Sequence, residues 1–301
     1  MSMQRLRLPP PTLESLFPPV RGYRYFAASS EWPFEHCEGV GCARRRWWLA
    51  EHALLAYEDC AVIAATLGTL GYPVEHCTQP ETSAFAYAAI KDSDGVLVFR
   101  GTQAMRPGDA PRKFKQVVND WMIDAAFMRT EEGAGLAHGG FARTLGLLWP
   151  QLQSLLPQAQ RWWVTGHSLG GALAALAALR LSQSMHALAG AVTFGQPRTG
   201  DAALVAALDR LPLVRVVNAC DMIPDLPPTA LGFAHTDRVN HLDAHRRAGY
   251  AQTLKRHLLR LPRNLRHGLG ALTPIELIDH APLHYAIKCY NQAFDAAKAS
   301  P

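Results

Sequence analysis

The sequence predicts an α/β fold in which a central, mostly parallel sheet is covered by helices on both faces. The first observation is that apolar runs typical of strands, such as 191–194 and 213–217, alternate along the chain with segments of helical periodicity. The second is that these runs are apolar at nearly every position, as in strands that are buried on both sides. The 301 residues are 49% hydrophobic and 18% charged, which is enough for a full core, and we expect one domain over 1–301.

The first hundred residues predict an irregular start, a helix and a hairpin. Prolines interrupt residues 1–43, which predicts an irregular segment on the surface. Residues 44–67 carry apolar side chains at helical spacing and predict one long helix. Strands at 85–90 and 96–99 are predicted to form a hairpin whose turn is supplied by Asp94-Gly95.

The remaining two thirds of the chain show the alternation on which the fold class rests. Residues 229–275 are less regular, are rich in His and Arg, and predict an insertion. The predicted helices are 141–156, 169–181, 201–210 and 283–297, and the predicted strands are 161–165, 191–194 and 213–217.

Charge and hydropathy argue against several classes of protein. The net charge of +5 is mild and no segment resembles a nucleic-acid-binding module, so we expect no nucleic-acid partner. No run of 18 apolar residues predicts a transmembrane segment, and the proline-rich start lacks the apolar stretch of a signal peptide. A cytoplasmic location is therefore the default expectation, with secretion by a route that needs no signal peptide left open.

The six cysteines contain no Cys-x-x-Cys pair, and we expect no metal site. Cys60 and Cys220 lie in apolar runs and are predicted to be buried small hydrophobes. His36, Cys37 and Cys42 lie close together and leave a metal site or a disulfide as alternatives.

The most specific motif is Gly166-His167-Ser168-Leu169-Gly170, a Gly-x-Ser-x-Gly pattern between a predicted strand and an Ala/Leu-rich helix. Two glycines in this context allow a sharp turn that lifts the serine hydroxyl above the sheet. The pattern predicts Ser168 as a nucleophile, against the alternative of an ordinary Ser/Gly turn. The backbone N–H of Leu169, the next residue, is then expected to donate to an oxyanion.

A serine nucleophile needs a base, usually histidine, and a carboxylate that orients the base. When the serine lies on such a turn, the acid and then the histidine follow it in the chain. The segment Asn218-Ala219-Cys220-Asp221 follows the strand 213–217, at the sheet edge where functional groups gather. Asp221 is the predicted acid, with Asp225 as the nearby alternative. The candidates for the base are the seven histidines after Asp221: His235, His241, His245, His257, His267, His280 and His284.

From about Trp47 to Tyr290 the chain resembles the class 3 lipase family, the fungal-lipase-like branch of the α/β hydrolases. The resemblance implies an α/β-hydrolase fold with a Ser-Asp-His triad. It rests on blocks that occur in the family's order: Val96–Thr102, Asn119–Asp124, His138-Gly139-Gly140-Phe141, Gly166–Gly171, Thr193–Gly200 and Asp221–Pro228.

The resemblance also implies roles for individual residues. Asp221 matches the acid, as the first residue of an Asp-x-x-Pro-x-Leu-Pro-Pro block. Asp-His followed by a tyrosine five residues later is similar to His280 with Tyr285, which favours His280 over His284 as the base. Thr102 matches the second oxyanion donor, through its backbone N–H and hydroxyl, and its alternative is an ordinary turn threonine.

By this resemblance we expect a lipase-like serine carboxylester hydrolase of lipid degradation, which cleaves acylglycerols or related lipid esters through an acyl-enzyme without cofactor or metal. Its partners would be a lipid or small-ester substrate and, transiently, a lipid interface. The alternatives are a phospholipase or acyltransferase, and a non-catalytic lipid-binding protein on the same fold.

Two basic segments have open interpretations. Residues 103–118 are either a mobile lid over the acyl site or an ordered basic loop. The second segment is either a site for an anionic headgroup or a solvated face, and it consists of His235, Arg246, Arg247, Lys255, Arg256, Arg263 and Arg266.

Overall fold

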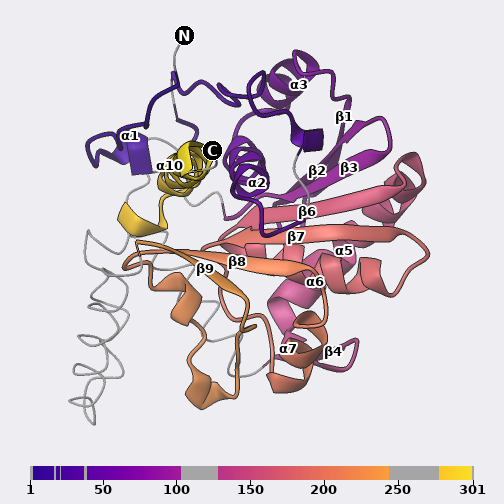
Figure 1. The fold of residues 1–301 in the computed structure, drawn as a ribbon. Helices are drawn as coiled ribbons and strands as arrows, with labels where there is room; N and C mark the ends of the chain where they lie inside the picture. The colour runs from indigo at the N-terminus through magenta and orange to yellow at the C-terminus, as the bar shows by residue number, and fades with distance from the viewer. Residues whose placement is uncertain are drawn as a thin grey trace, which may run out of the picture.

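A seven-stranded sheet lies at the centre of the computed structural model (Figure 1). The structure describes residues 3–16, 18–20, 22–36, 39–102, 128–243 and 278–299. The strand order is β1-β2-β3-β6-β7-β8-β9, in which β3 and the strands after it run parallel, while β1 and β2 form an antiparallel edge. The strands are β1 (Val74–Gln79), β2 (Ala84–Lys91), β3 (Asp94–Phe99), β6 (Arg161–His167), β7 (Ala187–Phe194), β8 (Leu213–Asn218) and β9 (Val239–Leu242).

Helices cover both faces of this sheet, as the alternating pattern predicts. Figure 1 shows α2 (Ala43–Leu55) and α10 (Pro282–Ala299) on one face, and α5 (Gly139–Leu155), α6 (Leu169–Ser182) and α7 (Ala202–Leu208) on the other. A two-stranded hairpin, β4 (Arg129–Glu132) with β5 (Gly135–His138), precedes α5. The short elements are α1 (Leu13–Leu16), α3 (Cys60–Gly68) and the 3-10 turns Phe34–His36, Leu156–Gln158, Ile223–Asp225 and Thr229–Leu231.

Each face of the sheet contributes to its own hydrophobic core. Along β2 and β3 the side chains alternate: Tyr87 and Val98 belong to the core that contains α2 and α10, whereas Ala88 and Leu97 belong to the core that contains α5 and α6. All four side chains are fully buried. Burial on both faces explains why the central strands are apolar at consecutive positions instead of alternating with polar residues.

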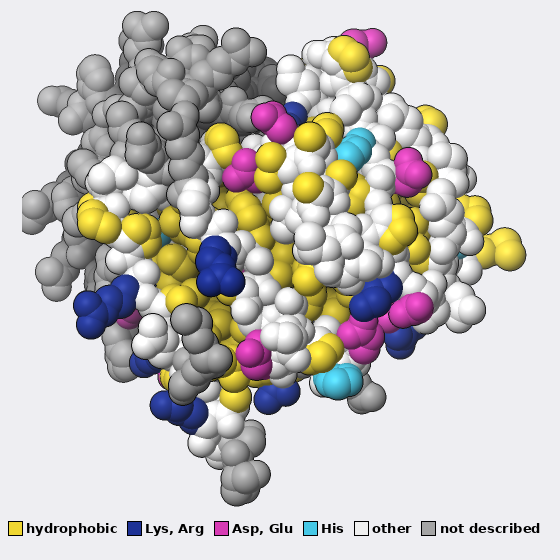
Figure 2. All heavy atoms as spheres, turned by 90° about the horizontal axis from the view of Figure 1, so that it is seen from above, with side chains coloured by type: hydrophobic (Ala, Val, Ile, Leu, Met, Phe, Trp, Pro, Cys, Tyr) yellow, Lys and Arg dark blue, Asp and Glu magenta, His cyan; other side chains and the backbone are white. Residues whose placement is uncertain are grey.

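The described part of residues 1–43 lies along α2 and α10 on one side of the molecule (Figure 1). Phe26 and Trp32 are buried in the core with these helices, so the segment contributes to the core as well as to the surface. Leu6 exchanges two backbone hydrogen bonds with the Asn291 side chain of α10. Figure 2 views the molecule from this side, and both positive and negative side chains are present on the described part of it.

The helix predicted over 44–67 is in fact two helices. α2 ends at Leu55 and α3 begins at Cys60, with Asp59 in an extended conformation at the N-cap position. Aspartate favours this position because its short polar side chain competes with helical backbone hydrogen bonds. The break places Tyr57 outside either helix.

The hairpin predicted between β2 and β3 forms, but its turn differs from the prediction. Lys91 pairs with Asp94, so the loop consists of Asp92 and Ser93, and Asp92 takes the positive φ of +54°. Gly95 lies within β3, where a Cβ atom would come within 2.3 Å of the Trp162 ring. The glycine is required by this packing and not by the turn.

The cysteines differ in part from the prediction. Cys60 is exposed on α3 and Cys220 is half-buried, so neither is the fully buried residue that was expected. Cys42 is disulfide-bonded, so of the two alternatives, a metal site or a disulfide, the structure shows the disulfide for this residue. Cys37 lies outside the described residues.

Candidate active site

Ser168 lies on a sharp turn between β6 and α6, with φ +58° and ψ −126°. This conformation is strained for a residue with a side chain. The flanking glycines make the turn possible: a Cβ atom at Gly166 would come within 2.2 Å of the Gly170 carbonyl oxygen, and one at Gly170 within 2.1 Å of the Phe99 carbonyl oxygen. The motif therefore folds as the sequence predicts, with Ser168 at the start of a helix.

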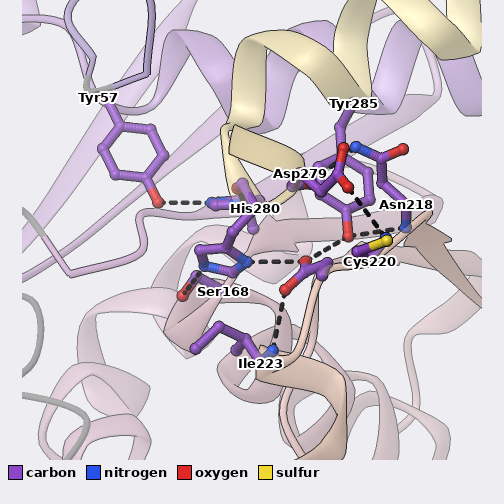
Figure 3. A network of polar contacts seen from close by, with 10 residues as sticks. Tyr57, Ser168, Asn218, Cys220, Ile223, Asp279, His280 and Tyr285 are labelled. Atoms are coloured by element: carbon purple, nitrogen blue, oxygen red, sulfur yellow. Dashed lines mark hydrogen bonds and ion pairs between the residues drawn. The ribbon is translucent and has the colours of Figure 1, made fainter. Parts of the chain in front are cut away.

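The structure brings Ser168, Asp221 and His280 together from three separate parts of the chain. His280 Nε2 lies 2.9 Å from Ser168 Oγ, and His280 Nδ1 lies 2.8 Å from Asp221 Oδ2 (Figure 3). The three residues are 3%, 0% and 6% exposed in the order serine, aspartate, histidine. Burial excludes water that would otherwise compete for these hydrogen bonds.

The surroundings of Asp221 fix the tautomer of His280. The Asp221 carboxylate is a hydrogen-bond acceptor, so His280 Nδ1 carries the proton that it donates, and Nε2 is left free to accept one from Ser168. Two further donors hold the carboxylate in place: the Tyr285 hydroxyl lies 2.6 Å from Oδ2, and the Ile223 backbone N–H lies 2.9 Å from Oδ1. The geometry is that of a serine hydroxyl with an oriented general base.

The sequence left Asp225 as the alternative acid and His284 as the alternative base. Asp225 forms an ion pair with Arg198, with 4.0 Å between Asp225 Oδ1 and Arg198 Nη2, and its backbone oxygen accepts a hydrogen bond from the same side chain. His284 lies four residues after His280, in the first turn of α10, and it is His280 that contacts both Ser168 and the acid.

The structure describes both residues that the sequence predicts as oxyanion donors, Leu169 and Thr102. Leu169 is the first residue of α6, and the N–H groups in the first turn of a helix have no acceptor within the helix. Thr102 follows β3, and its hydroxyl is buried with no hydrogen-bond partner in the described part of the chain. A buried hydroxyl without a partner is costly unless a ligand supplies one.

Gly195 is a site residue that the sequence did not reveal by itself. It has a φ of +55°, and a Cβ atom there would come within 2.9 Å of Asp221 Oδ2 and 3.0 Å of the His280 ring. Its signal in the sequence is the block Thr193–Gly200, in which a glycine directly follows the end of an apolar strand.

A sequence profile of the family described as Lipase (class 3) matches residues 96–231. This segment belongs to the class 3 lipase family. It contains the predicted serine, the predicted acid and both predicted oxyanion residues, and His280 lies beyond it.

Several curated lipases are similar to this chain. A lipase from Rhizomucor miehei is 32% identical over 195 residues, which are 60% of this chain and 48% of the relative. The secreted mono- and diacylglycerol lipase A of Penicillium cyclopium is 28% identical over 187 residues, 59% of this chain and 57% of the relative. The chain thus spans about half the length of the curated relatives it matches.

The solved structure of the Rhizomucor miehei triacylglyceride lipase superimposes with a TM-score of 0.53 and 26% sequence identity, covering 65% of this chain and 78% of that one. The class 3 lipase segment therefore lies in an α/β-hydrolase fold, as the motif blocks implied.

Outside the class 3 lipase segment and its base, other predicted features are only partly described. The whole of the predicted lid, 103–118, lies outside the described residues, and so do all members of the basic cluster except His235. His235 Nε2 lies 2.7 Å from the Pro224 carbonyl oxygen, at the loop that follows Asp221. Over the residues that the structure describes, no three His, Cys, Asp or Glu side chains are grouped as metal ligands. Nor does any helix in those ranges have the length and hydropathy needed to cross a bilayer.

Proposed function

We propose that this protein is a lipase-like serine carboxylester hydrolase. The observation that carries the proposal is the continuous contact from Ser168 through His280 to Asp221, at 2.9 and 2.8 Å, on a strained turn that begins a helix. The resemblance of residues 96–231 to class 3 lipases supports the same chemistry.

In the proposed reaction Ser168 Oγ attacks the ester carbonyl while His280 Nε2 takes the serine proton. Asp221 stabilises the imidazolium that forms. The N–H of Leu169 and the groups of Thr102 donate to the oxyanion of the tetrahedral intermediate. His280 then gives its proton to the departing alcohol, and a water molecule activated by His280 releases the acid from the acyl-enzyme.

The proposed substrate is an acylglycerol or a related lipid ester. The support is the naming of two relatives, a mono- and diacylglycerol lipase and a triacylglyceride lipase. Long-chain esters of this kind aggregate in water, so transient contact with a lipid interface is part of the proposal.

The test compares wild-type protein with Ser168→Ala on p-nitrophenyl esters of short and long acyl chains, the long ester also as an emulsion. We expect kcat to fall by about four to six orders of magnitude in the variant. Ser154→Ala is the matched control, because Ser154 is an exposed serine of α5, and its rate should equal that of the wild type.

The outcomes separate the proposal from its alternatives. Ester hydrolysis that survives in Ser168→Ala would contradict the assignment of the nucleophile. A wild-type protein that binds the emulsion without turnover would point to the non-catalytic lipid-binding alternative, and product that depends on an added alcohol would point to acyl transfer.

A further inference from the structure

His167, the residue before the predicted nucleophile, has both ring nitrogens in hydrogen bonds. Its Nε2 lies 2.8 Å from the backbone oxygen of His280, and its Nδ1 lies 2.9 Å from the hydroxyl of Tyr57 (Figure 3 labels Tyr57). The His167 and His280 rings lie 4.6 Å apart. His167 is 3% exposed, so water does not replace these partners. The proposed triad mechanism uses neither Tyr57 nor this imidazole.

The direction of each hydrogen bond follows from the partners. The His280 carbonyl oxygen only accepts, so the proton of a neutral His167 is on Nε2. Nδ1 is then an acceptor, and the Tyr57 hydroxyl donates to it. Burial raises the pKa of Tyr57, which keeps it a donor, and burial together with the adjacent His280 lowers the pKa of His167 well below its ordinary value, which keeps it neutral.

The Tyr57 hydroxyl also touches the turn that carries the predicted oxyanion donor. A Cβ atom at Gly101 would come within 2.1 Å of the Tyr57 hydroxyl oxygen and 2.6 Å of the His167 carbonyl oxygen. Gly101 directly precedes Thr102. We call residues 100–102 the oxyanion turn and residues 278–281, which carry His280, the base segment.

These contacts link segments that are distant in sequence. Tyr57 lies 110 residues before His167, and His167 lies 113 residues before His280. One chain of contacts thus joins the oxyanion turn, the residue before the nucleophile and the backbone of the base. A displacement of about 1 Å among such groups can cost about a hundredfold in rate.

We propose that Tyr57 and His167 are positioning residues that hold the oxyanion turn and the base segment in register with Ser168. The proposal rests on the proposed hydrolase function. Because neither residue touches the reacting atoms, their loss should slow the chemical step and leave substrate binding unchanged.

The kinetic test is Tyr57→Phe, which removes one hydroxyl and keeps the ring. We expect kcat on a short p-nitrophenyl ester to fall about 10- to 100-fold, with KM within twofold of the wild type. The matched control is Tyr87→Phe, because the Tyr87 hydroxyl also lies on a buried histidine, 2.9 Å from His52 Nδ1, away from the triad. Its kcat should stay within twofold of the wild type.

Coupling is tested with His167→Phe and the double variant. If the two residues act through one chain, the double variant is no slower than His167→Phe alone. Losses that multiply would contradict the coupling. If Tyr57→Phe hydrolyses the ester as fast as the wild type, the inference is overturned. If the wild-type activity is at the same time lost in Ser168→Ala, the proposed function stands.

A measurement without turnover keeps the inference testable if no ester is hydrolysed. In protein with ¹⁵N-labelled histidine rings, NMR at pH 7 should find His167 neutral, with its proton on Nε2, and His167→Phe assigns the signal. In Tyr57→Phe the Nδ1 resonance should move toward that of a nitrogen without a hydrogen bond. A proton on Nδ1, or an unchanged resonance in Tyr57→Phe, would overturn the inference.

Discussion

At the scale of single residues, the site depends on Gly195 as well as on Ser168, Asp221 and His280. Gly195 combines a positive φ with direct contact to the pair formed by Asp221 and His280. For a residue with a Cβ atom this conformation costs about 1–2 kcal/mol. The Cβ atom would also press on the hydrogen bond that orients the base. The glycine thus serves both the backbone and the chemistry.

Gly195→Ala is therefore expected to reduce kcat by about 100-fold or more and to destabilise the protein by about 1–2 kcal/mol. The measurements are ester hydrolysis and denaturant unfolding. Gly146→Ala is the control, because Gly146 lies within α5, where an added Cβ atom would meet nothing within 4 Å. That variant should gain about 0.5–1 kcal/mol and keep its activity. Full activity in Gly195→Ala would contradict the steric argument.

How far the site could be predicted from the sequence depends on whether its residues are local. Ser168 and Leu169 lie within one motif and Asp221 lies three residues after the apolar strand β8, so local pattern alone pointed to all three. The base was one of seven histidines, and only resemblance selected His280. Tyr57 had no signal, because its role arises from a contact across 110 residues that no local pattern encodes.

At the scale of elements, a single arginine holds the loop that carries the acid. Arg198 follows β7 and donates to the backbone oxygens of Asp225 and Pro227, and its backbone N–H donates to the Leu226 oxygen. These contacts tie the loop after β8 to the loop after β7. They fix the path of the chain just beyond Asp221.

Removal of this tie should affect both stability and rate. Arg198→Ala is expected to cost about 1.5–3 kcal/mol, the range for hydrogen bonds of a charged donor, and to lower kcat because Asp221 loses its fixed loop. The control is Arg161→Ala, which breaks an ion pair with Asp94 whose arginine is 58% exposed and should cost about 1 kcal/mol or less. Unfolding by urea and ester assays measure both effects. Equal behaviour of the two variants would show that the loop needs no arginine.

The elements that the sequence predicted well are those with a strong periodic or apolar pattern, such as β6, α6, β8 and α10. The edge strand β1 was not predicted, because its sequence Val-Glu-His-Cys-Thr-Gln is polar at most positions and only Cys77 is buried. The four-residue β9 is too short to carry a pattern. The break between α2 and α3 was missed because apolar spacing continues across it, although Asp59 stands at the N-cap position of α3.

At the scale of the whole molecule, hydrogen bonds to one buried carboxyl group, that of Glu51, help to hold the N-terminal segment against α2. Glu51 of α2 accepts hydrogen bonds from the Tyr23 hydroxyl, the Phe26 backbone N–H and the Trp47 indole, at 2.7, 3.1 and 3.0 Å. The residue is 1% exposed. Burial raises its pKa to about 7, although the three donors act in the opposite direction.

This raised pKa gives stability a definite dependence on pH. Between about pH 4.5 and 7 the folded protein keeps a proton on Glu51 that the unfolded chain releases, so the free energy of unfolding falls as the pH rises through this window, by about 3 kcal/mol in all. Glu51→Gln cannot titrate and should lack this fall. The measurement is urea unfolding of both proteins at pH 5, 6, 7 and 8.

The difference between wild type and variant isolates Glu51 from the other buried groups. His52 and His167 have pKa values lowered by burial, and each therefore removes stability as the pH falls below about 6.5, in the opposite sense to Glu51. Both histidines are present in both proteins, so their effect cancels in the difference.

Glu58→Gln serves as the control, because Glu58 accepts a hydrogen bond from Tyr25 at 2.7 Å but is only half-buried. That variant should keep the wild-type fall in the free energy of unfolding. A parallel pH dependence of wild type and Glu51→Gln would mean that the buried carboxyl stays ionised in the folded protein and that its three donors outweigh its burial.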